Sequence, residues 1–413
     1  MRHKTLLLIL FSIFICVTGF GQNTRSPYSI FGPGELQSKS FGRGMAMGGV
    51  GIGVSSGSYI NMLNPASYSG FDSLKFVYEM GFEGKYSHFK SQGNRLNDHT
   101  FNFKYIAFGF RVTDWWATSI GIAPFTNVGY TITTSTYING SQDKFYSSYE
   151  GSGGINYASL GNAVKLGNFS LGVNTSYLFG SITQDELISQ PSNIISSFIM
   201  QRTDYLHSFY FDYGAQYSFK LKGWDYTLGA IYSNEQRLVS RHQVNIMDVD
   251  YTVKSSNEYK ATHLRVPEKY GLGISIKKGP FVHIAGDYEF QKWSGLKYPI
   301  QKGPFLDTHR FAAGVESKPW GDIMTLDWYK KIVYRVGANY QTSFLKINGK
   351  QIDETAITFG LGIPVKNTGS LLNFTVEAGK KGTVSNRLVK ENYVVFHMNF
   401  AINEIWFRKR IFY

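Results

Sequence analysis

Hydrophobic and polar side chains alternate along many short stretches of this chain, most clearly in residues 281–291. Asp287 and Glu289 fall on one face of this stretch, whereas Ile284 and Phe290 fall on the other. A period of two residues is that of a β-strand whose faces meet unlike environments. A lipid-facing Lys or Arg near the bilayer midplane costs about 2–4 kcal/mol. We therefore expect the charged faces to point into the lumen of a barrel.

The same alternation predicts fourteen strands between residues 74 and 403. Short turns alternate with longer polar connections, as they do in outer-membrane barrels, and an even strand number suits that class. The connection at residues 318–332 is the exception, because a short turn is expected there. The fold class is therefore all-β, a transmembrane antiparallel β-barrel of fourteen strands. The predicted strands cover residues 74–83, 101–112, 117–128, 155–166, 169–180, 205–219, 224–235, 270–277, 281–291, 309–317, 333–343, 354–364, 371–379 and 393–403.

A different pattern precedes the first strand, where residues 41–71 are rich in glycine and nearly free of charge after Arg43. Such a segment has a high entropic cost of ordering and few side chains for a core of its own. We therefore predict an N-terminal hatch at residues 23–72, enclosed by a barrel of residues 73–413 and entering it from the periplasmic side. Asn64, Pro65 and Ala66 should form a rigid turn in this hatch, because proline fixes φ and restricts the preceding residue.

The first residues predict export. Arg2 and Lys4 precede an apolar run at residues 6–17, and small residues follow, so residues 1–22 are expected to be a cleaved signal peptide. The only cysteine, Cys16, lies in that run, which excludes disulfides and thiolate metal sites from the mature chain. No later apolar run is long enough for a membrane helix, and aromatic residues make up 16% of the chain. This composition suits an outer-membrane barrel with aromatic girdles, whereas a soluble array of β-sandwiches would need linkers that are not evident.

Charge and motifs argue against a nucleic-acid partner and against catalysis. Removing Arg2 and Lys4 with the signal peptide lowers the formal charge from +13 to +11, and the remaining basic residues are dispersed. Attraction to anionic outer-membrane lipids is the simpler explanation. The G-x-S-x-G match at residues 53–57 lacks the strand-turn-helix context of a catalytic serine, and the nine histidines show no metal-binding spacing. We expect no enzyme activity, no cofactor and no metal.

Two further sets of residues are candidates for function. Charged residues on the predicted lumen faces are expected to form ion pairs that brace the hatch, with a polar substrate path as the alternative. A stretch at residues 188–200 could form an amphipathic helix over the barrel mouth, and it could capture a ligand, contact a protein partner or pack against its own loops. The lumen set is Glu79, Lys104, Asp287, Glu289, Arg335 and Glu377, and the capture set is Ile194, Ile195, Phe198, Ile199 and Met200.

The chain resembles the FadL-type transporters, outer-membrane barrels that take up long-chain fatty acids and other hydrophobic compounds. The residues that carry the resemblance are Asn64-Pro65-Ala66 after a glycine-rich start, LRVPEKYGLG at residues 264–273, AGDYEF at 285–290 with Trp293-Ser294, and HRFAAGVE at 309–316. The resemblance spans nearly the whole mature chain, weakly in the loops. It implies a fourteen-stranded barrel, an internal hatch and a hydrophobic ligand path, with Arg43, Asn64, Pro65 and Ala66 as hatch or ligand-path residues.

On this basis the sequence predicts passive uptake of hydrophobic small molecules across the outer membrane of a Gram-negative cell. The alternative is a non-transporting FadL-like subunit or scaffold of an outer-membrane protein secretion or assembly complex, as barrels of this fold serve in type IX secretion. The expected partners are outer-membrane lipids, a hydrophobic small molecule and, under the alternative, other outer-membrane proteins. An apolar tunnel from residues 188–200 to Asn64 would favour uptake.

Overall fold

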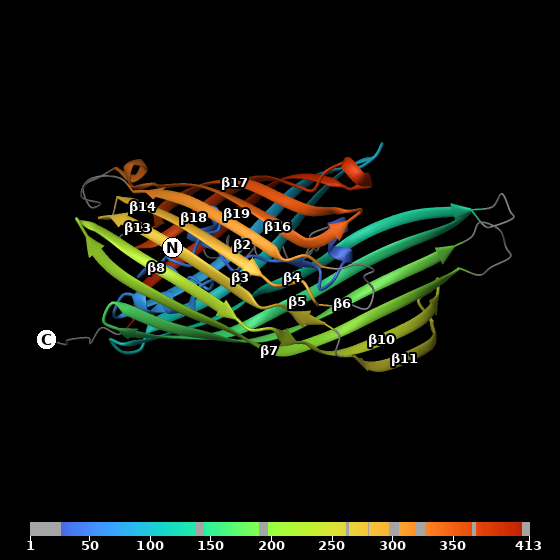
Figure 1. The fold of residues 1–413 in the computed structure, drawn as a ribbon, viewed down its shortest axis with the longest axis horizontal. Coiled ribbons are helices and arrows are strands. Elements are labelled where there is room, and N and C mark those ends of the chain that lie inside the picture. Colours follow the sequence, from blue (N-terminus) through green and yellow to red (C-terminus); the bar gives the residue numbers. More distant parts are fainter. Residues whose placement is uncertain are drawn as a thin grey trace, which may run out of the picture.

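The computed structural model describes residues 26–137, 144–189, 197–261, 264–279, 281–296, 305–318, 327–365 and 369–406. Among these residues, fourteen antiparallel strands close into one barrel (Figure 1), which confirms the predicted fold class. The predicted signal peptide at residues 1–22 lies outside the described residues. The wall consists of β2 (Lys75–Lys90), β3 (Arg95–Arg111), β4 (Trp116–Tyr137), β5 (Lys144–Leu166), β6 (Phe169–Ser189), β7 (Phe198–Leu221), β8 (Trp224–Ser233), β13 (Lys269–Lys278), β14 (Val282–Gln291), β15 (Thr308–Ser317), β16 (Val333–Ile347), β17 (Lys350–Val365), β18 (Ser370–Lys381) and β19 (Lys390–Ile405).

Strand pairing follows the chain order, with two exceptions. β8 pairs with β13, because β9 (Gln236–Arg237), β10 (Val239–Asp248), β11 (Val253–Ala261) and β12 (Arg265–Val266) lie between them in sequence. β19 pairs with β2, which closes the ring. β10 and β11 form a hairpin that extends the sheet beyond the wall by pairing with β7 (Figure 1).

The barrel has two unlike ends. Tight turns such as 167–168 and 222–223 join strands at one end, which we call the turn end, and the opposite end is the loop end. β4 to β7 have 21 to 24 residues and extend further than the other strands at the loop end. β8, β13, β14 and β15 have only 10 residues each. The fourteen predicted strands leave residues 85–100 and 130–154 as connecting loops. This prediction is wrong for most of their described length, because backbone pairing carries these strands beyond the membrane-spanning pattern.

The faces of the wall divide as their residue types require. In β16, Tyr334 and Val336 are 50% and 56% exposed, whereas Arg335 between them is 1% exposed. In β14, Asp287 and Glu289 are buried on the inner face. No helix among the described ranges is long and apolar enough to cross a membrane. Apolar side chains thus face outward along the strands, and charged side chains face a filled interior.

The interior is filled by residues 26–72, which we call the plug segment (Figure 1, blue). It contains η1 (Pro27–Ile30), β1 (Glu35–Leu36), α2 (Gly42–Met45) and η2 (Pro65–Gly70). Ser26 donates to the carbonyl of Gly129 in the loop-end half of β4, whereas the segment's last residues lead into β2 at the turn end. The described segment therefore runs from near the loop end to the turn end, and its entry from the periplasmic side stays a prediction.

An aromatic layer covers the plug segment at the loop end. Trp293 stacks on Phe344 with ring centroids 4.2 Å apart, and Phe305 contacts both rings edge-on. Tyr28 and Leu388 complete this cap, and the Tyr28 hydroxyl donates to the carbonyl of Val389. Two short helices lie in connections, η3 (Trp328–Lys331) and η5 (Ser385–Arg387).

Candidate functional site

The plug segment touches the backbone of the wall directly, because glycines remove the intervening side chains. A Cβ on Gly337 would lie 2.1 Å from the backbone nitrogen of Gly48, and one on Gly314 would lie 2.3 Å from the carbonyl oxygen of Met47. Heavy atoms cannot approach so closely, so these two wall positions require glycine. The plug segment and the wall are fitted surfaces at this point.

A buried ion-pair cluster binds the plug segment near the turn end. Glu316 of β15 receives two hydrogen bonds from Arg43, at 2.7 and 2.8 Å, and one from Arg335 of β16 at 2.7 Å. All three side chains are at least nine-tenths buried. Arg335 also donates to the hydroxyl of Tyr59 in the plug segment. A buried carboxylate with two guanidinium partners is strongly held. Without this carboxylate, each arginine would be an uncompensated buried charge.

Two other wall carboxylates hold plug backbone rather than plug charges. Asp287 accepts hydrogen bonds from the amides of Gly51 and Ile52 at 2.6 and 2.9 Å. Glu79 of β2 accepts from the amide of Ile60 at 2.8 Å. Each carboxylate accepts hydrogen bonds from backbone amides of an irregular segment. Without these bonds the amides would be buried with no partner. The glycine-rich segment is therefore fixed by the wall rather than by its own secondary structure.

Asn64 is the centre of the turn predicted for the Asn-Pro-Ala motif. Its side-chain oxygen accepts from the amide of Ala66 and caps η2, and its side-chain nitrogen donates to the carbonyls of Ile52 and of Ala215 in β7. Asn64 is 0% exposed, and a Cβ on Gly214 would lie 2.0 Å from its side-chain oxygen. The motif thus joins two parts of the plug segment to the wall. These contacts agree with a structural turn.

We expect Asn64→Ala to lower the free energy of unfolding by about 1–3 kcal/mol, because it removes a helix cap and a buried hydrogen-bond donor. Urea titration of the barrel refolded in lipid vesicles measures this loss. The matched control is Asn168→Ala in an exposed turn, which should stay within about 0.5 kcal/mol of the parent. Equal effects of the two changes would contradict a special role for Asn64.

The plug segment also completes a seam in the wall. Pairing between β3 and β4 runs only from Ile106↔Ile122 to Arg111↔Ala117, although β4 continues to Tyr137. β1 pairs with the edge of β4 at residues 126–127. On the other side, Lys104 of β3 donates to the side-chain oxygen of Gln37 at 2.6 Å. The plug segment therefore bridges β3 and β4 from within, where direct pairing between them has ended.

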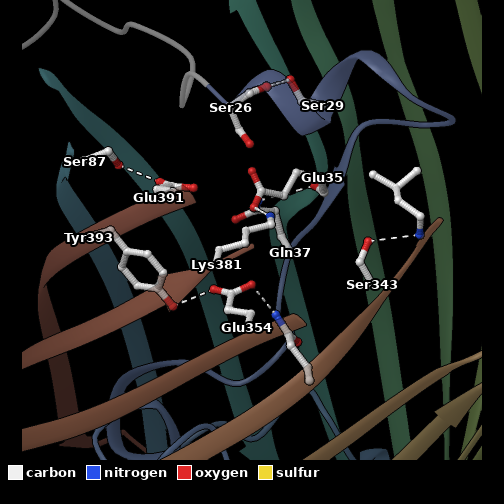
Figure 2. A network of polar contacts seen from close by, with 12 residues as sticks. Ser26, Ser29, Glu35, Gln37, Ser87, Ser343, Glu354, Lys381, Glu391 and Tyr393 are labelled. Carbon is white, nitrogen blue, oxygen red and sulfur yellow. Dashed lines mark hydrogen bonds and ion pairs between the residues drawn. The ribbon is translucent and has the colours of Figure 1, made fainter. Parts of the chain in front are cut away.

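Two plug residues carry charges in the loop-end half. Glu35 pairs with Lys381 of β18, and Figure 2 shows this pair beside Glu354 and Tyr393. Burial alone would raise the pKa of Glu35, but the ammonium groups of Lys381 and Lys85 lower it to about 2. Because the folded-state pKa is depressed, this carboxylate stabilises the fold above about pH 4.5, and that contribution disappears as the pH falls towards 2.

Lys39 occupies an aromatic box. Its ammonium group lies 2.5 Å from the carboxylate of Asp212 and 4.8 to 5.8 Å from the ring centroids of Phe125, Tyr157 and Tyr210. Burial lowers the pKa of Lys39 to about 8, although the Asp212 carboxylate opposes that shift. Cation-π contacts and a buried carboxylate together fix this end of the plug segment to β4, β5 and β7.

The cavities left in the lumen are small, and charged side chains contribute to their linings. A cavity of about 190 Å³ lies below the aromatic cap, with Lys39, Lys269, Glu289 and Arg310 in its lining. A second cavity of about 120 Å³ is lined by four glutamates, and we call it the acidic cavity. A third of about 30 Å³ lies beside Arg43. None of these three linings includes Asn64 or Met200.

The six lumen residues chosen from the sequence all lie on the inner face of the wall. Besides the contacts above, Lys104 pairs with Glu83 at 3.2 Å, and Glu289 pairs at 2.6 Å with Arg310, which donates to plug carbonyls. Glu377 contacts Tyr393 of β19. Within the described ranges no three acidic, histidine or cysteine side chains converge as metal ligands.

The capture set is only partly described. Ile194 and Ile195 lie outside the described residues. Phe198, Ile199 and Met200 begin β7 and pair with both β6 and β10, so the amphipathic helix predicted for them is wrong. Backbone pairing on both sides holds these three residues in the extended wall, and Ile199 is 5% exposed.

Sequence reasoning missed several residues that carry the contacts of the plug segment. Glu316 and Asp212 lie on inner faces of predicted strands, where their charge was a usable signal, whereas Lys381 lies two residues beyond the predicted end of its strand. Glu35 and Lys39 precede the glycine-rich stretch and carry no motif. Their partners depend on which strands meet across the lumen, and alternation within single strands does not contain that information.

Comparison with known proteins gives one family and one fold. A family model described as BamG matches residues 1–413. No curated protein matches the chain.

Solved structures of similar fold include two toluene transporters and a FadL homologue. The Ralstonia pickettii toluene transporter TbuX matches with a TM-score of 0.61 and 14% identity, over 88% of this chain and 98% of its own. The Pseudomonas putida toluene transporter TodX matches with a TM-score of 0.61 and 13% identity, over 90% and 100%. A Pseudomonas aeruginosa FadL homologue matches with a TM-score of 0.61 and 12% identity, over 90% and 99%. The shared fold is therefore that of FadL-type barrels.

Proposed function

Because this chain belongs to the BamG family, we propose that it is a non-transporting subunit or scaffold of an outer-membrane protein secretion or assembly complex. The chain is a multi-pass β-barrel of the outer membrane with a FadL-like fold. In the proposal, residues 26–72 act as a permanent seal. The barrel then contributes a rigid, closed body to a larger assembly, and other outer-membrane proteins are its partners.

The fixed plug segment is the observation that carries this proposal. Arg43 binds β15, whereas Asn64 and Lys39 both bind β7, and the ion pairs of Arg43 and Lys39 are buried. Moving the segment would separate charges in a low-dielectric interior, which costs about 3–5 kcal/mol for one broken buried pair. Ligand pockets for drug-sized molecules typically measure about 300–1,000 Å³ and are mostly apolar. The cavity of about 190 Å³ is smaller than this range, which supports a seal better than an open ligand path.

Passive uptake of hydrophobic small molecules is the second candidate, and the fold likeness to toluene transporters favours it. Uptake would require a path past the plug segment, which the contacts described above hold against the wall. The two functions therefore differ in whether the plug segment has to move.

A disulfide between the plug segment and the wall tests this difference. The hydroxyl oxygens of Ser69 in η2 and Ser170 in β6 are 2.8 Å apart, so Ser69→Cys/Ser170→Cys should form a bond after mild oxidation. Cys16 is the only native cysteine and lies within the predicted signal peptide. We expect the oxidised variant to support growth and to co-isolate with the same outer-membrane proteins as the parent.

The control is the same variant kept reduced, together with Ser170→Cys alone. Native mass spectrometry of the gently extracted protein identifies bound lipids and subunits together. Loss of growth or of hydrocarbon uptake on oxidation alone, with no protein partners in the spectrum, would overturn the proposed function in favour of uptake.

A further inference from the structure

The carboxylates around the acidic cavity do not all have cationic partners. Glu35 pairs with Lys381, Glu83 with Lys104, Glu391 with Lys85 and Glu289 with Arg310, one cation for each carboxylate. Among the ion pairs of the described residues, Glu354 and Glu377 have no lysine or arginine partner. Both line the cavity. The site therefore has two carboxylates beyond those that lysine and arginine neutralise.

One hydroxyl group lies within reach of both of these carboxylates. The Tyr393 hydroxyl lies 2.5 Å from Oε1 of Glu354 and 3.2 Å from Oε1 of Glu377 (Figure 2 shows Tyr393 pointing to Glu354). A phenol has a single hydrogen and can donate to only one of them. Gly379 permits this arrangement, because a Cβ there would lie 2.4 Å from the Tyr393 ring. The shorter contact, to Glu354, is the hydrogen bond, so Glu377 receives no hydrogen bond from this hydroxyl.

Glu377 is the group whose charge is least compensated. Its side chain is 9% exposed, and its Oε2 atom is buried without a hydrogen-bond partner among the described residues. Nε2 of His397 lies 3.6 Å from this oxygen, and Nδ1 of His397 lies 3.5 Å from Glu83. Burying a carboxylate oxygen without a donor is costly, so a positive charge or a proton must reach this oxygen.

We propose that the acidic cavity binds one monovalent cation, an alkali-metal ion or ammonium, held by Glu354, Glu377 and the Tyr393 oxygen. The cavity volume of about 120 Å³ accommodates an ion with a few waters, since a water occupies about 30 Å³. The absence of three convergent acidic or histidine ligands among the described residues argues against a divalent site.

This cation would join three wall strands to the plug segment. Glu354, Glu377 and Tyr393 belong to β17, β18 and β19, and Glu35 of the plug segment lines the same cavity. Binding only to the folded barrel stabilises it in proportion to the logarithm of the free cation concentration. The inference does not depend on whether the barrel transports a ligand.

Thallium(I) locates the cation directly, because it replaces potassium and scatters anomalously. Crystals of the full barrel soaked in thallium acetate should show an anomalous peak between Glu354 and Glu377. In urea titrations at constant ionic strength, each tenfold rise in potassium or ammonium above its dissociation constant should raise the folded-to-unfolded ratio about tenfold relative to N-methyl-D-glucamine. Separate titrations with the two ions distinguish an alkali-metal ion from ammonium.

Glu377→Gln should abolish both the peak and the cation dependence, and Tyr393→Phe should shift the dependence to higher concentrations if the first variant does not fold. Glu404→Gln, at an exposed position near the other end of β19, is the matched control and should retain both signals. The absence of a peak, with equal stability in potassium and N-methyl-D-glucamine, would overturn the proposal and assign the compensating charge to a proton.

Discussion

Replacing Glu316 with alanine is expected to destabilise the barrel by about 3–5 kcal/mol and to loosen the plug segment. The change leaves Arg43 and Arg335 close together with no carboxylate between them. Their mutual repulsion acts in a buried site, where water screens it poorly. Urea titration in lipid vesicles measures the loss of stability, and limited proteolysis of residues 26–72 reports on the plug segment.

Glu186→Ala is the matched control, because Glu186 lies 3.9 Å from Arg202 in a partly exposed pair. Exposed pairs contribute about 0–1 kcal/mol, so this variant should unfold almost as the parent does. A combined change of Glu316, Arg43 and Arg335 to apolar residues of similar size should restore much of the stability lost in Glu316→Ala. If Glu316→Ala and Glu186→Ala unfold alike, the buried cluster does not hold the plug segment.

Gly337→Val is expected to displace the plug segment and open an ion-conducting lumen. The new side chain would occupy the space of the Met47 and Gly48 backbone, which cannot yield as a flexible side chain does. Overpacking typically costs about 1–3 kcal/mol, and this position should exceed that range because the opposing atoms are backbone. Single-channel recording in planar bilayers measures the conductance.

Ala338→Val provides the control at the next residue, which points outward from the same strand. Valine suits a lipid-facing strand position, so the barrel should remain closed and stable. Conductance in both variants, or in neither, would show that the contact between Gly337 and Gly48 does not determine closure.

The wall was predictable because its pattern is local. A lumen on one side and lipid on the other impose the alternation on each strand separately, so residues such as Asp287 and Ile284 reveal their faces without reference to any other strand. The fourteen predicted strands all correspond to wall strands. Their loop-end extensions were not predictable, because beyond the membrane both faces meet water and the alternation weakens.

The contacts of the plug segment were harder to predict. Inner-face charges such as Arg335 and Glu377 follow from alternation, but their partners depend on tertiary register across the lumen. The Asn64 turn was recognisable from its own residues, because proline and asparagine act locally. The direction of the plug segment along the lumen was not predicted, because glycine-rich sequence carries no periodicity that would orient it.

The path of the plug segment has a consequence for the order of assembly. Its first described residues lie beneath the aromatic cap at one end, and its last residues continue into β2 at the other. Between them, Met47 and Gly48 press against wall backbone with no room for a threading chain. The segment therefore has to be in place while the sheet is still an open curved ribbon. The seam between β19 and β2 joins the last wall strand to be synthesised to the first. Pairing of these two strands would close the barrel around a plug segment that is already in place.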